Sequence, residues 1–409
     1  MITTIINARV FDGERVLDDQ TVVIDGAHIS AIGGAVPVEA TVVDARGATL
    51  MPGLIDAHVH TSLDGLRDAL VFGVTTELEM QGHWTAQDRE TVANRDDVAD
   101  VRSAGFGLTT PGGHPSELFP DDGPPPGVNI EDGHGHDFEP PTVSTPDQAA
   151  ELVAALVANG SDYIKIFIEE GSVLGAPGLP LLSNETITTA VSEAHRHGKM
   201  AIAHTLTAAA TQQAIAAGMD GLAHVFVDHP TTTPEVVAAI ADSGAFVTPC
   251  LCLNSSIMGN TGVALATDDR VSSKLSKEWL DTLSSSFNTY PQGDFEDVLA
   301  TVADLHEAGV DILVGTDVSV PVPFLGGLAH GASVHHELQL LVAAGLTPIE
   351  ALRAATVLPA RRFGLTDRGR VAPGARADLL LVDGDPTTNI ADTLSIRGVW
   401  RRGIRLATR

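Results

Sequence analysis

Eight short apolar segments alternate with helix-like segments in the middle of this chain, and no other feature limits its possible folds as strongly. They lie at residues 54–60, 74–80, 104–110, 162–168, 199–205, 220–226, 245–250 and 311–317. Helical patterns fall between them, for example at 146–160, 184–198 and 233–244. Apolar strands that alternate with helices indicate a parallel sheet. Eight such units predict an α/β fold of the (β/α)8 TIM barrel type, and an open doubly wound sheet is the competing topology.

The two ends of the chain differ from this middle. Residues 1–52 and 366–409 are rich in β-branched residues with Gly and Asp-Gly punctuation, a pattern typical of short strands. Because an isolated hairpin is only marginally stable in water, we expect both ends to share one small β domain rather than to form two unrelated strand pairs. The predicted division of the chain is therefore 1–52, 53–365 and 366–409.

Two insertions make the middle longer than a typical barrel of about 250 residues. Residues 111–141 are rich in Gly and Pro, and residues 251–294 carry a polar, helix-like piece at 272–287. Both follow predicted strand ends, at the face where barrels place their active-site loops. Long loops at this face are candidate lids.

The charge of the chain excludes several classes of partner. Lys and Arg total 24 and Asp and Glu total 53, which gives a formal charge of −29. Such an excess of carboxylates repels phosphate, so we expect neither nucleic acid nor an anionic membrane as a partner. Since no leader sequence and no stretch of ~20 apolar residues is visible, we expect a cytoplasmic protein. The two cysteines, Cys250 and Cys252, exclude a disulfide scaffold and a cysteine-type zinc site.

Histidine and aspartate recur where the predicted strands end. His58 and His60 close the first strand, and alternate residues of a strand point to the same side. His204, His224 and Asp317 close the fifth, sixth and eighth strands. Taken singly, a strand-end Asp often caps the next helix, and a strand His is often a hydrogen-bonded core residue. Together the five predict a metal site, because imidazole and carboxylate are ligands that Zn²⁺ prefers.

Lys165 stands in the apolar strand YIKIFI, where burying an ammonium group is costly. One interpretation is an ion pair with Glu169 or Glu170. The other starts from burial, which lowers the pKa of a lysine and makes its amine nucleophilic. Such an amine can add carbon dioxide to form a carbamate, an anion with two oxygens that is suited to bridging two metal ions.

The segment MPGLIDAHVH, followed in order by Lys165, His204, His224 and Asp317, resembles the amidohydrolase superfamily. The C-terminal stretch that begins HHELQLLVAAGLTP and ends ARADLLLVDGDP is similar to the same superfamily, above all to its imidazolonepropionase-related and Xaa-Pro-dipeptidase-like branch. The resemblance covers essentially the whole chain. It implies a (β/α)8 barrel, a small composite β-sandwich built from the N- and C-terminal segments, and a binuclear metal centre with two divalent ions, usually zinc.

The resemblance also implies a role for each strand-end residue. By this resemblance the first ion would be held by His58, His60 and Asp317. The second ion would be held by His204 and His224. Lys165, as N6-carboxylysine, would bridge the two ions. The segment PGGHPSEL resembles a loop that places a histidine near the substrate. His114 is therefore a candidate substrate-binding residue, and His229 is a second candidate.

The expected reaction is hydrolysis of a carbon–nitrogen bond in an amide, a carbamate, an N-acyl amino acid or a cyclic amide. The expected nucleophile is a metal-bridging hydroxide, because bound metal lowers the pKa of water. Asp317 is placed to carry the proton to the leaving nitrogen, and His224 to assist at the oxyanion. The alternatives are ester, lactone or organophosphate hydrolysis at the same ions, and a non-catalytic oligomeric scaffold. The expected partners are a small-molecule substrate and further copies of the chain in a homo-oligomer.

Overall fold

The computed structural model describes residues 2–118, 141–228 and 234–407, and the middle of the chain forms two parallel sheets. The first sheet has the order β6–β7–β8 and the second the order β12–β11–β10–β9. Their bounds are β6 Leu54–Val59, β7 Val74–Glu79, β8 Asp100–Ser103, β9 Ile164–Phe167, β10 Ala201–His204, β11 Gly221–Ala223 and β12 Phe246–Thr248. Every pairing within the two sheets is parallel, as the alternation of strands and helices predicts.

Short parallel bridges connect the edges of the two sheets. The bridged pairs are Leu108–Ile166, Val247–Ile312 and Val59–Val318. The amide of His60 also donates to the carbonyl of Val318 (2.8 Å). The segment 311–318 therefore lies between β12 and β6, and it brings Asp317 next to the end of β6.

Two of the eight expected strands differ from those in the structure. The third was expected at 104–110 and is found at β8, while the later segment makes only the bridge at Leu108. The sequence of β8, DVRS, is more polar than that of a typical core strand, so the sequence pattern did not indicate a strand here. Asp100 is nevertheless buried, because it pairs with arginines of the C-terminal segment. The eighth segment, 311–317, makes single-residue bridges and no regular strand.

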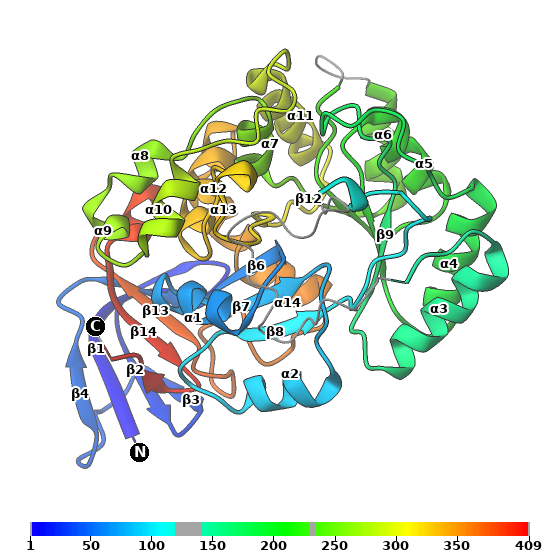
Figure 1. Ribbon diagram of the computed structural model, residues 1–409. Helices are drawn as coiled ribbons and strands as arrows, with labels where there is room; N and C mark the ends of the chain where they lie inside the picture. Colours follow the sequence, from blue (N-terminus) through cyan, green and yellow to red (C-terminus); the bar gives the residue numbers. More distant parts are fainter. Residues whose placement is uncertain (1, 119–140, 229–233, 408–409) are drawn as a thin grey trace.

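Helices follow the strands, and α3 to α6 lie on the outer side of the sheet that contains β9 (Figure 1). The helices expected at 146–160, 184–198 and 233–244 are confirmed as α3 Pro146–Ala158, α4 Asn184–Arg196 and α6 Pro234–Ser243. The hydroxyls of Thr145 and Ser183 begin α3 and α4 by accepting from amides of the first turn, which satisfies donors that a helix start leaves unpaired. The other helices here are α1 Leu63–Val71, α2 Ala86–Ala93 and α5 Ala208–Ala216.

The insertion after β12 is built from short helices. In chain order they are α7 Leu251–Ile257, α8 Val263–Ala266, α9 Asp269–Ser272 and α10 Lys277–Leu283, and the chain continues with α11 Phe295–Glu307, α12 Ala332–Ala343, α13 Pro348–Ala354 and α14 Val357–Arg362. The polar piece expected to be helical at 272–287 contains α10. Most of the other insertion, 119–140, lies outside the described residues. Within the described ranges no helix combines the length and apolar character that a bilayer span requires.

Both ends of the chain enter one eight-stranded sheet, which lies beside the parallel sheets (Figure 1). Its order is β15–β14–β13–β5–β1–β2–β3, and β4 pairs with β1. The bounds are β1 Ile2–Phe11, β2 Val16–Asp25, β3 His28–Ile32, β4 Thr41–Asp44, β5 Thr49–Pro52, β13 Leu379–Val382, β14 Ile396–Arg401 and β15 Ile404–Arg405. Since β13 pairs with β5, the first and last segments of the sequence depend on each other.

Candidate metal centre

Three of the expected ligands meet where β6 ends. Nε2 of His58 and Nε2 of His60 approach the same oxygen, Oδ1 of Asp317, at 2.9 and 3.0 Å. His58 belongs to β6, His60 directly follows it, and the 311–318 segment supplies Asp317. The three side chains offer donor atoms that all lie within 4.8 Å of one another. Because β6 and the 311–318 segment run side by side and in parallel, the end of each brings its residues next to the other, although His60 and Asp317 are far apart in the sequence.

Two further histidines adjoin this group from the next sheet. His204 closes β10, and His224 follows β11. Nε2 of His224 lies 3.2 Å from Nδ1 of His204 and 4.0 Å from Oδ2 of Asp317. The carboxylate of Asp317 therefore faces histidines of both sheets, with one oxygen toward each group.

Lys165 lies in β9 and is completely buried. Among the described residues its Nζ has no hydrogen-bond partner, and burial lowers its pKa to about 8. The ion pair considered from the sequence is not formed: Oε2 of Glu169 lies 3.3 Å from Nε2 of His204, and Glu170 accepts from the amide of Ser172. An unpaired buried amine is costly, so this position is suited to chemical change or to an anionic partner.

Burial sets the protonation of the centre. It lowers the pKa of His58 to about 3 and those of His204 and His224 well below the usual histidine value. Burial would raise the pKa of Asp317, but its contacts with His58 and His60 hold that pKa well below the usual range. Neutral imidazole and ionised carboxylate are the forms that ligate metal.

Two residues of the centre have an unusual backbone conformation. His224 has φ of 72° and Asp317 has φ of 58°, in the left-handed region that costs non-glycine residues roughly 1–2 kcal/mol each. Such conformations cluster at functional sites, where the surrounding structure holds them in place. Here they turn the chain sharply as each strand-like segment ends.

A buried carboxylate supports the first group of ligands, and the sequence analysis missed it. Oδ2 of Asp56 accepts from the hydroxyl of Thr316 at 2.6 Å, and Oδ1 accepts from the amides of His58 and Thr316 at 3.2 and 3.1 Å. Asp56 thus fastens β6 to the segment that carries Asp317. Its position in the apolar run LIDAHVH, two residues before His58, was the available signal.

The two candidate substrate residues have different outcomes. His114 is buried, and its ring centroid lies 4.5 Å from that of His204. Its Nδ1 is 2.5 Å from Oε1 of Glu117, which orients the ring beside the centre. His229 lies outside the described residues.

The side chains present fit a pair of divalent ions. They supply three imidazoles that burial keeps neutral and an ionised carboxylate. They also supply His60, whose pKa the contact with Asp317 raises against the effect of burial, and a buried amine with no partner among the described residues. Imidazole and carboxylate suit zinc and related ions, and a carbamate on Lys165 would add an anionic ligand between the two groups.

Comparisons with known proteins agree with this arrangement. The model of the amidohydrolase family matches residues 49–405. Over 110 residues the chain is 39% identical to the imidazolonepropionase of Deinococcus deserti, a match that covers 25% of each protein. Such local matches span a quarter or less of the relatives' own length. A longer alignment, 26% identical over 414 residues, covers 97% of this chain and 94% of an imidazolonepropionase of Cereibacter sphaeroides.

The fold is also similar to solved structures. A Xaa-Pro dipeptidase with methionine bound in its active site has a TM-score of 0.73 to this chain, with 22% identity over the full length of both. At that identity the likeness establishes the fold, which is α/β of the TIM-barrel type.

Proposed function

The chain belongs to the amidohydrolase family, and from this premise we propose that it hydrolyses a carbon–nitrogen bond at a centre of two divalent ions. His58, His60 and Asp317 hold the first ion in this proposal, and His204 and His224 hold the second. Lys165, as N6-carboxylysine, is the bridge, and zinc is the metal we favour. The observation that carries the proposal is the carboxylate of Asp317, which meets both β6 histidines at 2.9 and 3.0 Å and faces His224 with its other oxygen.

Bound ions would lower the pKa of a coordinated water toward ~7 and polarise the substrate carbonyl. The protein itself supplies the rest. Asp317 is ionised and touches both groups of ligands, so it takes the proton of the attacking water and delivers it to the leaving nitrogen. His224 faces Asp317 from the second group and stabilises charge that develops on the carbonyl oxygen. His114 orients the substrate beside His204.

We also propose the architecture that positions this chemistry. The bridges at Leu108, Ile312 and Val318 support one closed barrel over residues 53–365. The shared terminal sheet supports a composite β-sandwich of 1–52 and 366–409. In such a barrel the four histidines and Asp317 lie at the carboxyl ends of the strands, where barrel enzymes place their active sites.

The proposal is tested with purified enzyme of known metal content. The assay panel contains N-acyl amino acids, dipeptides, carbamates, anilides and lactones, each measured for kcat/KM. We expect turnover of at least one amide-type or carbamate substrate, and loss of that turnover after chelation. Turnover confined to lactones or other esters would replace the proposed bond class. Full activity in thoroughly metal-free enzyme would refute the metal centre.

A further inference from the structure

We propose that Cys250 is a sulfur donor to one of the two ions of this centre, at a position that adjoins both His58 of the first ion and His224 of the second. The inference rests on the proposed metal centre and extends it. Cys250 follows β12, the one strand of the second sheet whose end contributes no ligand to the proposed set. A thiolate there would make the centre favour borderline and soft ions such as zinc, cobalt and cadmium over magnesium or calcium.

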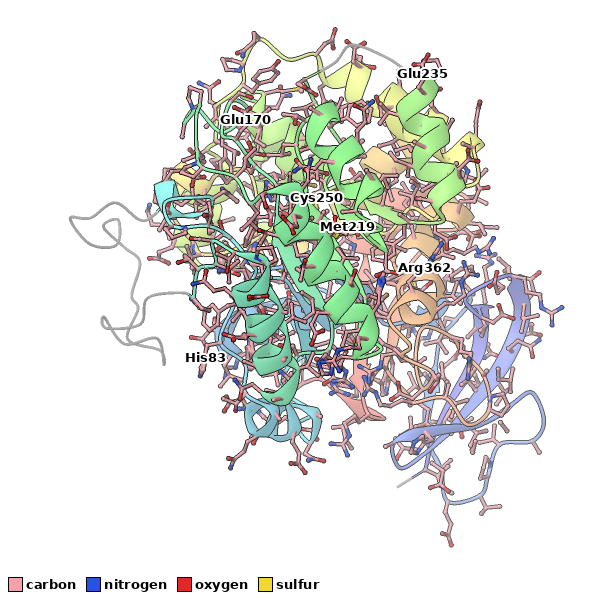
Figure 2. The ribbon with its side chains drawn as sticks, turned by 90° about the vertical axis from the view of Figure 1, so that its right-hand side faces the viewer. His83, Glu170, Met219, Glu235, Cys250 and Arg362 are labelled. Carbon is pink, nitrogen blue, oxygen red and sulfur yellow. The ribbon has the colours of Figure 1, made fainter. Side chains whose placement is uncertain are left out.

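The donor atoms of Cys250, His58 and His224 all lie within 4.8 Å of one another, and all three residues are buried. Zinc bonds to sulfur and to imidazole nitrogen are about 2.3 and 2.0–2.1 Å long. In a tetrahedral site such bonds place two donors on one ion about 3.3–3.6 Å apart, so donor atoms that are farther apart than this draw together when the ion binds. Cys250, labelled near the middle of the view in Figure 2, is completely buried.

A second observation points to a ligand at this place. Nδ1 of His58, Nδ1 of His224 and Nζ of Lys165 are all buried, and none has a hydrogen-bond partner among the described residues. Buried polar groups are normally paired, because leaving one unpaired costs about 1–3 kcal/mol. Unpaired buried nitrogens on both histidines that share a donor group with Cys250 are expected of an ion site rather than of an ordinary core thiol.

The backbone holds Cys250 in a specific conformation. Its φ is 52°, in the left-handed region, and the next two amides, of Leu251 and Cys252, each donate to the buried carboxylate of Glu337 at 2.8 Å. The thiol itself has only a weak contact, 3.5 Å from the carbonyl of Thr248. The sulfur can therefore exchange that contact for a metal bond at little cost.

Cys252 provides the contrast within the same turn. It is equally buried, but its sulfur lies 3.5 Å from the carbonyl of Ser333 on α12 and belongs to no donor group among the described residues.

Coordination by Cys250 replaces its S–H bond by a sulfur–metal bond and releases one proton for each ion bound. No electron is transferred and no oxidant is required.

Cobalt substitution tests the inference. The apoenzyme is loaded with Co²⁺, and the absorption spectrum and the bound cobalt are measured for the wild type, Cys250→Ser and Cys252→Ser. Visible d–d bands report an occupied centre whatever its donors, whereas a near-ultraviolet sulfur-to-cobalt charge-transfer band requires a thiolate ligand. We expect the wild type and Cys252→Ser to show the charge-transfer band at equal intensity, and Cys250→Ser to lose it while it keeps its d–d bands.

Each other result has one meaning. Bound cobalt with d–d bands but no charge-transfer band in the wild type overturns the role of Cys250 and leaves the proposed function intact. Failure to bind cobalt at all overturns both. If Cys250→Ser does not fold, the assignment still follows from Cys252→Ser, because the chain has only two cysteines: a retained band belongs to Cys250, and a lost band assigns the sulfur to Cys252 instead.

Discussion

The carboxylate of Asp317 contacts the two β6 histidines and faces His224 of the second group. An isosteric replacement of Asp317 distinguishes a role in proton transfer from a role as a helix cap. Asp317→Asn removes charge and basicity but keeps size. We expect kcat to fall by about 10²–10⁴-fold, the usual contribution of a positioned acid–base group, with a much smaller change in KM. Metal content is measured in the same sample, since the carboxylate is also a proposed ligand.

A matched control for this substitution is Asp294→Asn. Asp294 caps α11 by accepting from the amide of Glu296, so it performs the simpler role that a strand-end aspartate could have. Near-normal kcat with two ions in Asp317→Asn would remove Asp317 from the chemistry.

Lys165 gives a second prediction at this scale. Lys165→Ala removes the buried amine and with it any carbamate, so we expect most activity and part of the bound metal to be lost. Short carboxylic acids added to the variant should restore some activity, because they can place an oxygen anion in the vacated space. Lys277→Ala, on the exposed face of α10, is the control and should behave as wild type. Wild-type turnover in Lys165→Ala would mean that the lysine is structural.

The positions of the strand-end residues in the candidate site were easier to predict from the sequence than the contacts across the fold. His58, His60, His204, His224 and Asp317 stand at strand ends, and the alternation of strands and helices suffices to bring such ends together. Asp56 was missed, and Cys250, the proposed sulfur donor, was excluded as a zinc ligand, for a different reason. Their roles depend on which side chains they face across the fold, and no spacing within the sequence carries that information.

The element that was placed wrongly, β8, shows where pattern reading fails. Its Asp100 is fully buried and pairs with three arginines that follow the last helix, namely Arg368, Arg376 and Arg401. A charged strand residue of this kind looks like a loop until its partners, more than 260 residues away, are known. Strands made mostly of apolar residues, such as β9, were placed to within two residues at either end.

Asp100→Asn tests how much β8 depends on this cluster. Burial would raise the pKa of Asp100, but the surrounding arginines hold it far below its usual value. Breaking a buried ion pair by removing one partner costs about 3–5 kcal/mol, and we expect a loss of that order in the free energy of unfolding, measured with denaturant. Asp281→Asn, in the exposed pair with Lys277, is the control and should change little.

The same cluster predicts the sign of an acid effect. Because the folded pKa of Asp100 lies below its ordinary value of 3.8, the unfolded chain binds the extra proton as the pH falls through that value. The stability that Asp100 contributes is therefore complete at neutral pH and is lost below about pH 4. A difference between wild type and Asp100→Asn that does not shrink on acidification would contradict this account.

Metal content is the prediction that concerns the whole molecule. The proposed centre should hold about two divalent ions per chain, and its ligands come from both parallel sheets and from the 311–318 segment. Ions that bind only the folded state stabilise it, by about 2.7 kcal/mol at a free concentration of 100 times Kd, so chelation should lower Tm. Elemental analysis and calorimetry on one sample check both points, and at most one ion after supply of zinc and bicarbonate would contradict the binuclear centre.

The left-handed backbone at His224, Cys250 and Asp317 has a consequence for how this protein can change. At each of these positions glycine would suit the local conformation better, and at His224 and Cys250 so would asparagine, so a search for thermostable variants that ignores catalysis should enrich such substitutions there. Each would gain stability while removing a functional donor atom, the usual trade between stability and activity. Selection for heat resistance alone would thus be expected to remove the proposed donor atoms one residue at a time.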